Sequence, residues 1–168
     1  MERQIIEHTL EPVYDGESRI LILGTMPSPK SRENGFYYGH PQNCFWRVLS
    51  EVLSDKLPVT NEEKRRFLLR HHIALWDVLK SCSIRGADDS SIKEPVPNDI
   101  AALVEKTNIR CIFTTGKKAY SLYTKYCKES TGLDAVSLPS TSPANRRYYS
   151  TDDIIREYCV LLEYLRKY

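Results

Sequence analysis

Short apolar runs that end at a glycine or a proline alternate along this chain with segments of helical periodicity. The clearest run is Arg19–Leu23, which is followed at once by Gly24. Runs this short and this continuously apolar are typical of strands buried on both faces of a sheet. Further runs of the same character are Ile73–Val78, Cys111–Thr114 and Ala135–Leu138. The pattern predicts an α/β fold, a three-layer α/β/α arrangement with a central, mostly parallel, four-stranded sheet.

Apolar side chains at helical spacing predict the helices that cover this sheet. Helices are expected over 44–53, 62–70 and 117–127, after a start at 97–99, and from Thr151 to near the C-terminus. The segment 80–98 is expected to be a long loop. The chain has 168 residues and no long linker or repeat, so residues 1–168 are expected to form a single domain.

The composition argues against several classes of protein. Apolar residues make up 41% of the chain and charged residues 27%, which is typical of a soluble globular protein. No apolar run approaches the roughly 20 residues of a membrane helix, and the charged N-terminus lacks the pattern of a secretory signal. The five cysteines form no Cys-x-x-Cys pair, so we expect reduced cytoplasmic thiols, with no metal site and no iron–sulfur cluster. The net charge of +2 neither demands nor excludes nucleic acid.

The loop after the first strand has an unusual composition. In a parallel sheet, ligands lie beyond the carboxyl ends of the strands, in the loops that follow them. Gly24 lets the backbone approach a ligand closely, and Pro27 and Pro29 stiffen the turn. Residues 36–46 then contain five aromatic rings together with a histidine and carboxamide side chains. This composition favours stacking on a flat ligand, although core packing explains some of the rings.

The motifs of this loop resemble those of a known family. Gly-x-x-Pro at 24–27 and Tyr-Tyr-x-His-Pro-x-Asn-x-Phe-Trp at 37–46 are similar to the first motif of the uracil-DNA glycosylase superfamily. Leu-Pro-Ser-Thr-Ser-Pro-Ala-Asn at 138–145 is similar to the second motif, and 75–92 matches in order and character. The resemblance spans about residues 10–165. It is closest to the hypoxanthine-DNA glycosylase branch and more distant from the mismatch-specific uracil/thymine branch.

The resemblance implies a monofunctional DNA glycosylase of base-excision repair. Such an enzyme flips a deaminated base, with hypoxanthine favoured, out of the duplex and hydrolyses its N-glycosidic bond. It requires no metal and no organic cofactor. The implied partner is double-stranded DNA with a damaged or mispaired base, bound by a monomer without a membrane or an iron–sulfur cluster. The implied location is the cytoplasm, in association with the nucleoid through the DNA.

Asn43 is the candidate catalytic residue. Its amide both donates and accepts hydrogen bonds, so it can orient a water or bind the flipped nucleotide. In the resemblance it occupies the asparagine position implicated in catalysis in the hypoxanthine branch. A purely structural reading is a cap on the helix that starts near Cys44, and the two roles are compatible.

The resemblance also assigns a base-binding pocket. Its members are Gly24, Thr25, Met26, Pro27, Tyr38, His40, Phe45, Asp89 and Ser90. Phe45 is expected to stack on the flipped base, although a core phenylalanine is an equal alternative. Met26 stands where much of the superfamily has Asp or Asn to handle the water. Since methionine cannot orient water, Met26 argues against strong classical uracil excision and agrees with the hypoxanthine branch.

The remaining candidates are expected to contact the DNA backbone or enter the duplex. They are Ser140, Thr141, Ser142, Pro143, Asn145, Arg146 and Lys117. Hydroxyls and backbone N–H groups of the 140–142 loop can bind phosphates. Lys117, at a helix start, can do the same together with the N–H groups of that helix. The plain alternative for the loop is a solvated Ser/Pro turn.

Other functions remain open at this point. One is a mismatch-specific uracil/thymine glycosylase, and another is a DNA-binding relative without catalysis, which Met26 keeps in contention. A third, from a different class, is a nucleotide-binding α/β protein. Gly24 and Gly116 both end strands, but neither belongs to a Gly-x-Gly-x-x-Gly or a Walker motif, so this reading lacks its usual signature.

Overall fold

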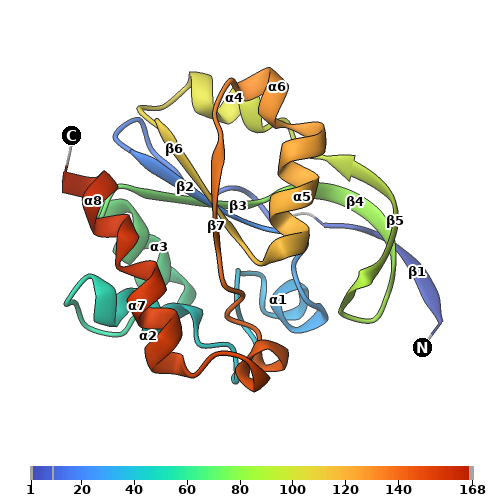
Figure 1. Ribbon diagram of the computed structural model, residues 1–168, viewed down its shortest axis with the longest axis horizontal. Helices are drawn as coiled ribbons and strands as arrows, with labels where there is room; N and C mark the ends of the chain where they lie inside the picture. Colours follow the sequence, from blue (N-terminus) through green and yellow to red (C-terminus); the bar gives the residue numbers. More distant parts are fainter. Residues whose placement is uncertain (1, 9, 167–168) are drawn as a thin grey trace.

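The four predicted strands form one parallel sheet in the order β3-β2-β6-β7. The computed structural model describes residues 2–8 and 10–166, apart from the side chain of Arg146. The strands are β2 (Ile20–Gly24), β3 (Ile73–Asp77), β6 (Cys111–Thr115) and β7 (Ala135–Leu138). Helices lie on both faces of this sheet (Figure 1), which confirms the three-layer α/β/α prediction.

Each face of the sheet has its own core. Ile20 and Ile22 of β2 pack on one face, whereas Leu21 and Leu23 pack on the other, and all four are fully buried. The first core is covered by α2 (Phe45–Val52), α3 (Asn61–Arg70), α7 (Thr151–Tyr158) and α8 (Val160–Arg166). The second is covered by α4 (Ile100–Glu105) and α5 (Lys117–Tyr126), with α6 (Lys128–Thr131) beside them. This two-sided burial is why the strands read as continuous apolar runs.

The helices begin where local capping directs them. Thr60 and Glu63 form a capping box at the start of α3, and Ser150 and Asp153 form one at the start of α7, each satisfying free N–H groups of the first turn. The predicted last helix is divided at Cys159 into α7 and α8. Among the described residues, no helix combines the length and the apolar character that a membrane span requires.

The prediction of a long loop over 80–98 is wrong. This segment forms a β-hairpin of β4 (Leu79–Arg85) and β5 (Asp88–Pro97), and β1 (Arg3–Glu7) completes an antiparallel sheet in the order β1-β4-β5. Leu79, Cys82 and Ile84 are buried, but polar residues between them interrupt the run. Irregular register between β4 and β5 further breaks the alternation that marks a strand. The hairpin stands beside the main sheet (Figure 1).

The carboxyl ends of the parallel strands meet at one edge. Gly24 at the end of β2 is in register with Asp77 at the end of β3, and Thr115 of β6 is in register with Leu138 of β7. The loop after β2 contains a short helix, α1 (Pro29–Asn34), and the loop after β7 contains a 3-10 turn, η1 (Pro143–Arg147). Both loops therefore start from the same edge, as a ligand site in a parallel sheet requires.

Candidate active site

A cavity of about 370 Å³ opens at this edge of the sheet, a size within the range of ligand sites. Its walls come from the loop after β2, the tip of the β4–β5 hairpin and the loop after β7. The predicted residues that line it are Gly24, Thr25, Met26, Pro27, Tyr38, His40, Asn43, Asp89, Ser140, Thr141, Ser142 and Pro143. Residues more than 100 positions apart in the sequence thus share one cavity.

The remaining predicted residues do not line the cavity. Phe45, Ser90, Asn145 and Lys117 lie outside its lining. Asn145 instead donates from Nδ2 to the carbonyl oxygen of Ser140 at 2.9 Å, so it stabilises the loop after β7. Lys117 is exposed at the first position of α5. The side chain of Arg146 lies outside the described residues.

Gly24 forms part of the floor of the cavity, where only glycine fits. A Cβ at this position would lie 2.6 Å from Oδ1 of Asp77 and 3.0 Å from the hydroxyl of Tyr38. Both distances are shorter than ordinary van der Waals contact. The predicted close approach at Gly24 is therefore an approach of two polar side chains, which are held directly above the end of β2.

Gly24→Ala is expected to damage both stability and activity. The added methyl group must displace Asp77 or Tyr38, and overpacking of this kind costs about 1–3 kcal/mol. Thermal unfolding and base-release rates would be compared with those of Gly16→Ala, because a Cβ at Gly16 meets nothing within 4 Å. Equal melting temperatures and rates for the two variants would contradict this account of Gly24.

Asn43 is fixed at the start of α2 with one end of its amide in use. Its Oδ1 accepts a hydrogen bond from the backbone N–H of Phe45 at 3.0 Å. The N-cap of α2 is Cys44, which makes no side-chain cap hydrogen bond, so Asn43 stabilises the helix start from the position before the cap and is not the cap itself. Its Nδ2 has no hydrogen-bond partner among the described residues, and the residue lines the cavity. The arrangement offers the cavity an oriented hydrogen-bond donor.

The two motif loops are joined directly beside Asn43. The backbone N–H of Cys44 donates to the carbonyl oxygen of Thr141 at 3.2 Å, across 97 positions of sequence. Thr141 is 1% exposed, and its buried hydroxyl has no partner within the described structure. In the same loop, the hydroxyl of Ser142 accepts from the N–H of Ala144 at 3.4 Å, at the start of η1. A buried unpaired hydroxyl is unusual, and here it lines the cavity.

The predicted role of Phe45 does not agree with its position. Phe45 is fully buried, and its ring stacks on Tyr38 at 3.8 Å between centroids, with 15° between the planes. Tyr38 lies between Phe45 and the cavity edge, and its hydroxyl is 3.1 Å from Oγ1 of Thr115. Tyr38 is thus the aromatic residue available to a flat ligand. Its φ of 53° is rare for a bulky side chain.

The neighbouring rings are structural. Tyr37 is 2% exposed and donates to the carbonyl oxygen of Glu11 at 2.7 Å, and Trp46 donates to the carbonyl oxygen of Tyr37 at 3.1 Å.

His40 lies at the cavity with Nδ1 accepting from the N–H of Gln42 at 3.1 Å. A neutral His40 with this bond carries its proton on Nε2. Met26 lines the cavity and packs against the second core.

Sequence reasoning missed a cavity carboxyl group with a strongly raised pKa, Asp77. It is 3% exposed, and its buried Oδ2 has no hydrogen-bond partner in the described part of the chain. Burial, and then the charge of Asp89, raise the pKa of Asp77 to about 8. The signal available in the sequence was an acid at the end of an apolar strand. Burying such an acid costs stability, so its presence there indicates a functional role.

The hairpin tip supplies a second carboxyl group. Asp89 is an exposed residue at the rim, yet its carboxyl faces the cavity and accepts a hydrogen bond from the hydroxyl of Thr25. Partial burial raises the pKa of Asp89, and the bond from Thr25 opposes that shift. Ser90 donates instead to Asp88 at 2.6 Å, in an exposed turn. Asp88 and Ser90 therefore belong to the surface, and Asp89 belongs to the cavity.

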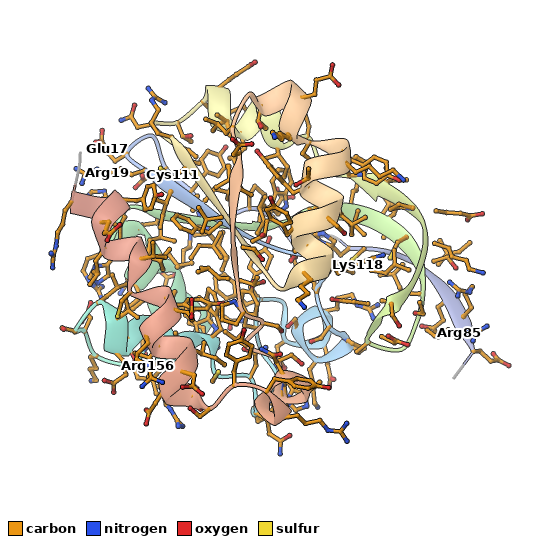
Figure 2. All side chains as sticks on the ribbon, viewed as in Figure 1. Glu17, Arg19, Arg85, Cys111, Lys118 and Arg156 are labelled. Carbon is orange, nitrogen blue, oxygen red and sulfur yellow. The ribbon has the colours of Figure 1, made fainter. Side chains whose placement is uncertain are left out.

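Positive charge reaches the cavity from two sides. Arg32 of α1 lines it, and its buried Nε has no partner among the described atoms. Lys118 lies at the beginning of α5, beside the hairpin (Figure 2), and its charge acts on Asp89.

In the described residues no group of three or more His, Cys, Asp or Glu side chains could hold a metal ion, and the five cysteines are free thiols.

Comparisons with known proteins agree with this geometry. The family model of the uracil DNA glycosylase superfamily matches residues 11–166. A hypoxanthine DNA glycosylase of Methanosarcina acetivorans is 37% identical over 146 residues, which are 86% of this chain and 91% of the relative. A protein of the same description from Methanosarcina barkeri is 36% identical over 81% of this chain and 86% of the relative.

A solved structure extends the likeness to the whole fold. It is a solution NMR structure of a Methanosarcina acetivorans protein described as a candidate uracil DNA glycosylase. It superimposes with a TM-score of 0.82 at 33% identity and covers 97% of this chain and 99% of its own. The chain, with its cavity between the two motif loops, therefore belongs to the uracil DNA glycosylase superfamily.

Proposed function

We propose that this protein is a monofunctional DNA glycosylase that removes a deaminated purine, hypoxanthine first, from duplex DNA in base-excision repair. The observation that carries the proposal is the amide of Asn43 at the cavity. Its oxygen is fixed by the N–H of Phe45, while its nitrogen has no hydrogen-bond partner among the residues that the structure describes. The relatives described as hypoxanthine DNA glycosylases support the choice of base.

The proposed chemistry uses preorganised dipoles. When the N-glycosidic bond breaks, positive charge develops on the sugar and negative charge on the departing base. A fixed N–H donor at this place stabilises the developing negative charge or holds the attacking water by its oxygen. Met26, the neighbour of Pro27 in the first motif, offers no hydrogen bond to a water. The donor of Asn43 therefore supplies a hydrogen bond that Met26 cannot.

The proposed DNA contacts surround the mouth of the cavity. Ser140, Thr141 and Ser142 line the cavity, where they are proposed to bind the phosphates that flank a flipped nucleotide. The 3-10 turn η1 follows them directly in the chain. Tyr148, which follows η1, is 76% exposed, so its ring is free to pack on the duplex. Lys117 at the start of α5 and Arg32 at the cavity wall add positive charge, which attracts the DNA backbone.

We propose that the protein acts as a monomer. Residues 1–168 are proposed to form a single domain, because both cores share the same four strands. We place the protein in the cytoplasm, associated with the nucleoid through its DNA substrate. The proposed reaction needs neither a metal nor an organic cofactor, because an amide, hydroxyls and carboxyls supply its polar groups.

A panel of duplex oligonucleotides tests the proposed function. Each duplex contains one hypoxanthine, xanthine, uracil or mispaired thymine, and alkali after incubation cleaves the strand wherever a base has been lost. Release of hypoxanthine at the highest rate is the expected result. Faster release of uracil or thymine from mispairs would move the protein to the mismatch-specific branch. Binding without any cleavage would indicate a non-catalytic relative.

A further inference from the structure

Asp77 is fixed in the cavity with an unused carboxyl oxygen. Its backbone carbonyl accepts from Nδ2 of Asn98 at 2.9 Å, and the next residue, Val78, donates to the carbonyl of Gly24 at 2.8 Å. These bonds hold the end of β3 against the end of β2. The carboxyl group is directed over Gly24, where a Cβ would lie 2.6 Å from Oδ1. Oδ2 is buried and has no hydrogen-bond partner within the described ranges, although Asp77 lines the cavity.

The groups around Asp77 leave its carboxyl without a cation. Tyr37 and Tyr38 face it from the loop after β2, and Asp89 faces it from the hairpin. The hydroxyl of Tyr38 is already paired with Thr115 at 3.1 Å. His40 and Arg32 line the same cavity, and Lys118 acts on Asp89. No described Lys, Arg or His forms an ion pair with Asp77.

We infer that Asp77 is the acid that protonates the departing base. This inference rests on the proposed function and adds a second catalytic group to it. A buried carboxyl beside another carboxyl and without a cation holds its proton. Burial and Asp89 raise the pKa of Asp77 to about 8, so at neutral pH Asp77 is mostly a neutral acid with one O–H to donate. Pairs of carboxyls with different environments mark acid and base roles elsewhere.

The proton balance of the step is complete. The bond between the sugar C1′ and the base nitrogen breaks, and its electron pair leaves with the base. Asp77 transfers its proton to an acceptor atom of the base, so the base leaves neutral and Asp77 becomes a carboxylate. Water adds to C1′, and the proton that this water releases passes to solvent. Asp77 takes a proton from solvent before the next cycle, and the net reaction is hydrolysis.

The test is the pH dependence of base release by Asp77→Asn. Asparagine nearly preserves the shape and can still donate a hydrogen bond, but it cannot transfer a proton. Single-turnover rates on a hypoxanthine duplex would be measured from about pH 5.5 to 9.5, with excess protein. The wild-type rate is expected to fall as pH rises through about 8, approaching tenfold for each further pH unit. The variant should be about 10²–10⁴-fold slower at pH 7 and lack this alkaline decline.

Asp89→Asn supplies a second, independent readout. Removing the negative charge at position 89 lowers the pKa of Asp77, since Asp89 is one of the two causes that raise it. The alkaline decline is therefore expected to move to lower pH with the same slope, whatever the variant does to the maximal rate. A decline that stays at the wild-type pH would show that another group titrates.

The outcomes separate this inference from the proposed function. An Asp77→Asn protein that keeps the wild-type rate, or that is slow but retains the alkaline decline, would overturn the acid role and leave the glycosylase activity standing. A wild-type protein that releases no base from any duplex would overturn the proposed function itself. Circular dichroism and binding of a duplex with a stable abasic-site analogue would verify that each variant is folded and binds DNA.

Discussion

Asn43→Ala is expected to slow the release of hypoxanthine by about 10²–10³-fold, the usual cost of removing one preorganised donor. The reason is the asymmetry of its amide in this structure. Oδ1 is occupied by the N–H of Phe45 at 3.0 Å, whereas Nδ2 has no partner in the described residues and the side chain lines the cavity. The measurement is a single-turnover rate on a hypoxanthine duplex.

Asn43→Asp is the matched control for the structural role of this residue. A carboxylate retains the acceptor for the N–H of Phe45, and it suits a helix start, but it has no N–H to offer the cavity. The variant is therefore expected to unfold at or above the wild-type temperature and to be about as slow as Asn43→Ala. The Ala variant should additionally lose about 1 kcal/mol of stability, the typical net contribution of one hydrogen bond, because the N–H of Phe45 loses its acceptor.

Either of two results would contradict this assignment. A fast Asn43→Asp protein would mean that the oxygen at position 43, not the nitrogen, does the work. Undiminished release by Asn43→Ala would remove Asn43 from the chemistry altogether and leave it as a helix-start residue. In that case Thr141, whose buried hydroxyl is unpartnered, would be the next group to replace.

The second large effect is on stability, where Asp77→Asn is expected to stabilise the protein at neutral pH. Burial and the charge of Asp89 raise the pKa of Asp77 to about 8 in the folded protein, against 3.8 for an ordinary aspartate side chain. Between these values the folded state binds more protons than the unfolded state, so the free energy of unfolding falls as pH rises. This loss amounts to about 4 kcal/mol at pH 7, because the free energy of unfolding falls by about 1.36 kcal/mol for each pH unit between 3.8 and 7.

The sign of this effect gives it a clear signature. At about pH 4 both proteins carry a neutral group at position 77, so their free energies of unfolding should be similar. The difference should then grow with pH in favour of the variant and level off above about pH 8. Urea unfolding of both proteins across this range is the measurement. Parallel curves would show that Asp77 is ionised in the folded protein at little cost.

The low-pH side of the curve depends on another residue and is shared by both proteins. Hydrogen bonds from His71 and Arg70 hold the pKa of Asp55 well below its usual range. The contribution of Asp55 is therefore present above its unfolded pKa and is lost as pH falls through the folded value. Because Asp55 is far from position 77 in sequence and is unchanged in the variant, it cancels in the comparison.

An acid that is costly to the fold and retained in the cavity is the pattern expected of a functional group. Functional sites often store unfavourable interactions that the rest of the structure compensates. Asp77 has this character, and the close approach of its carboxyl to Gly24 adds a steric constraint. If Asp77→Asn is more stable than the wild-type protein but slower in base release, Asp77 lowers the stability of the fold and contributes to the reaction.

Much of the fold could be predicted because a central strand that is buried on both faces needs apolar residues at consecutive positions. The β4–β5 hairpin could not, because its buried residues are separated by polar ones and its register is irregular. The error had a consequence for the site. Asp89 was predicted to lie on a long loop, whereas the structure holds it near the tip of a hairpin, next to Thr25.

The aromatic residues show a different limit. The sequence places Tyr38 and Phe45 in one loop, but the pattern does not say which ring covers the other. The backbone turns at Tyr38 with a φ of 53°, and its ring then lies over Phe45 at 3.8 Å. In this conformation the hydroxyl of Tyr38 is hydrogen-bonded to Thr115, which is 77 positions away, and no local sequence rule predicts such a contact.

The sequence by itself determined the three α/β/α layers and the positions of the two motif loops, and it made Asn43 the candidate catalytic residue. It could do so because strand burial, glycine turns and motif spacing are local properties of a chain. Only the tertiary structure decided what the cavity contains. It brings Asp77 close enough to Asp89 for the charge of Asp89 to raise the pKa of Asp77. It holds the carboxyl of Asp77 over Gly24, without an ion-pair partner among the described residues, and it stacks Phe45 against Tyr38, outside the cavity lining. The physical reason is that the pKa of a buried acid and the exposure of a ring depend on neighbours from distant segments, which meet only when the sheet has formed.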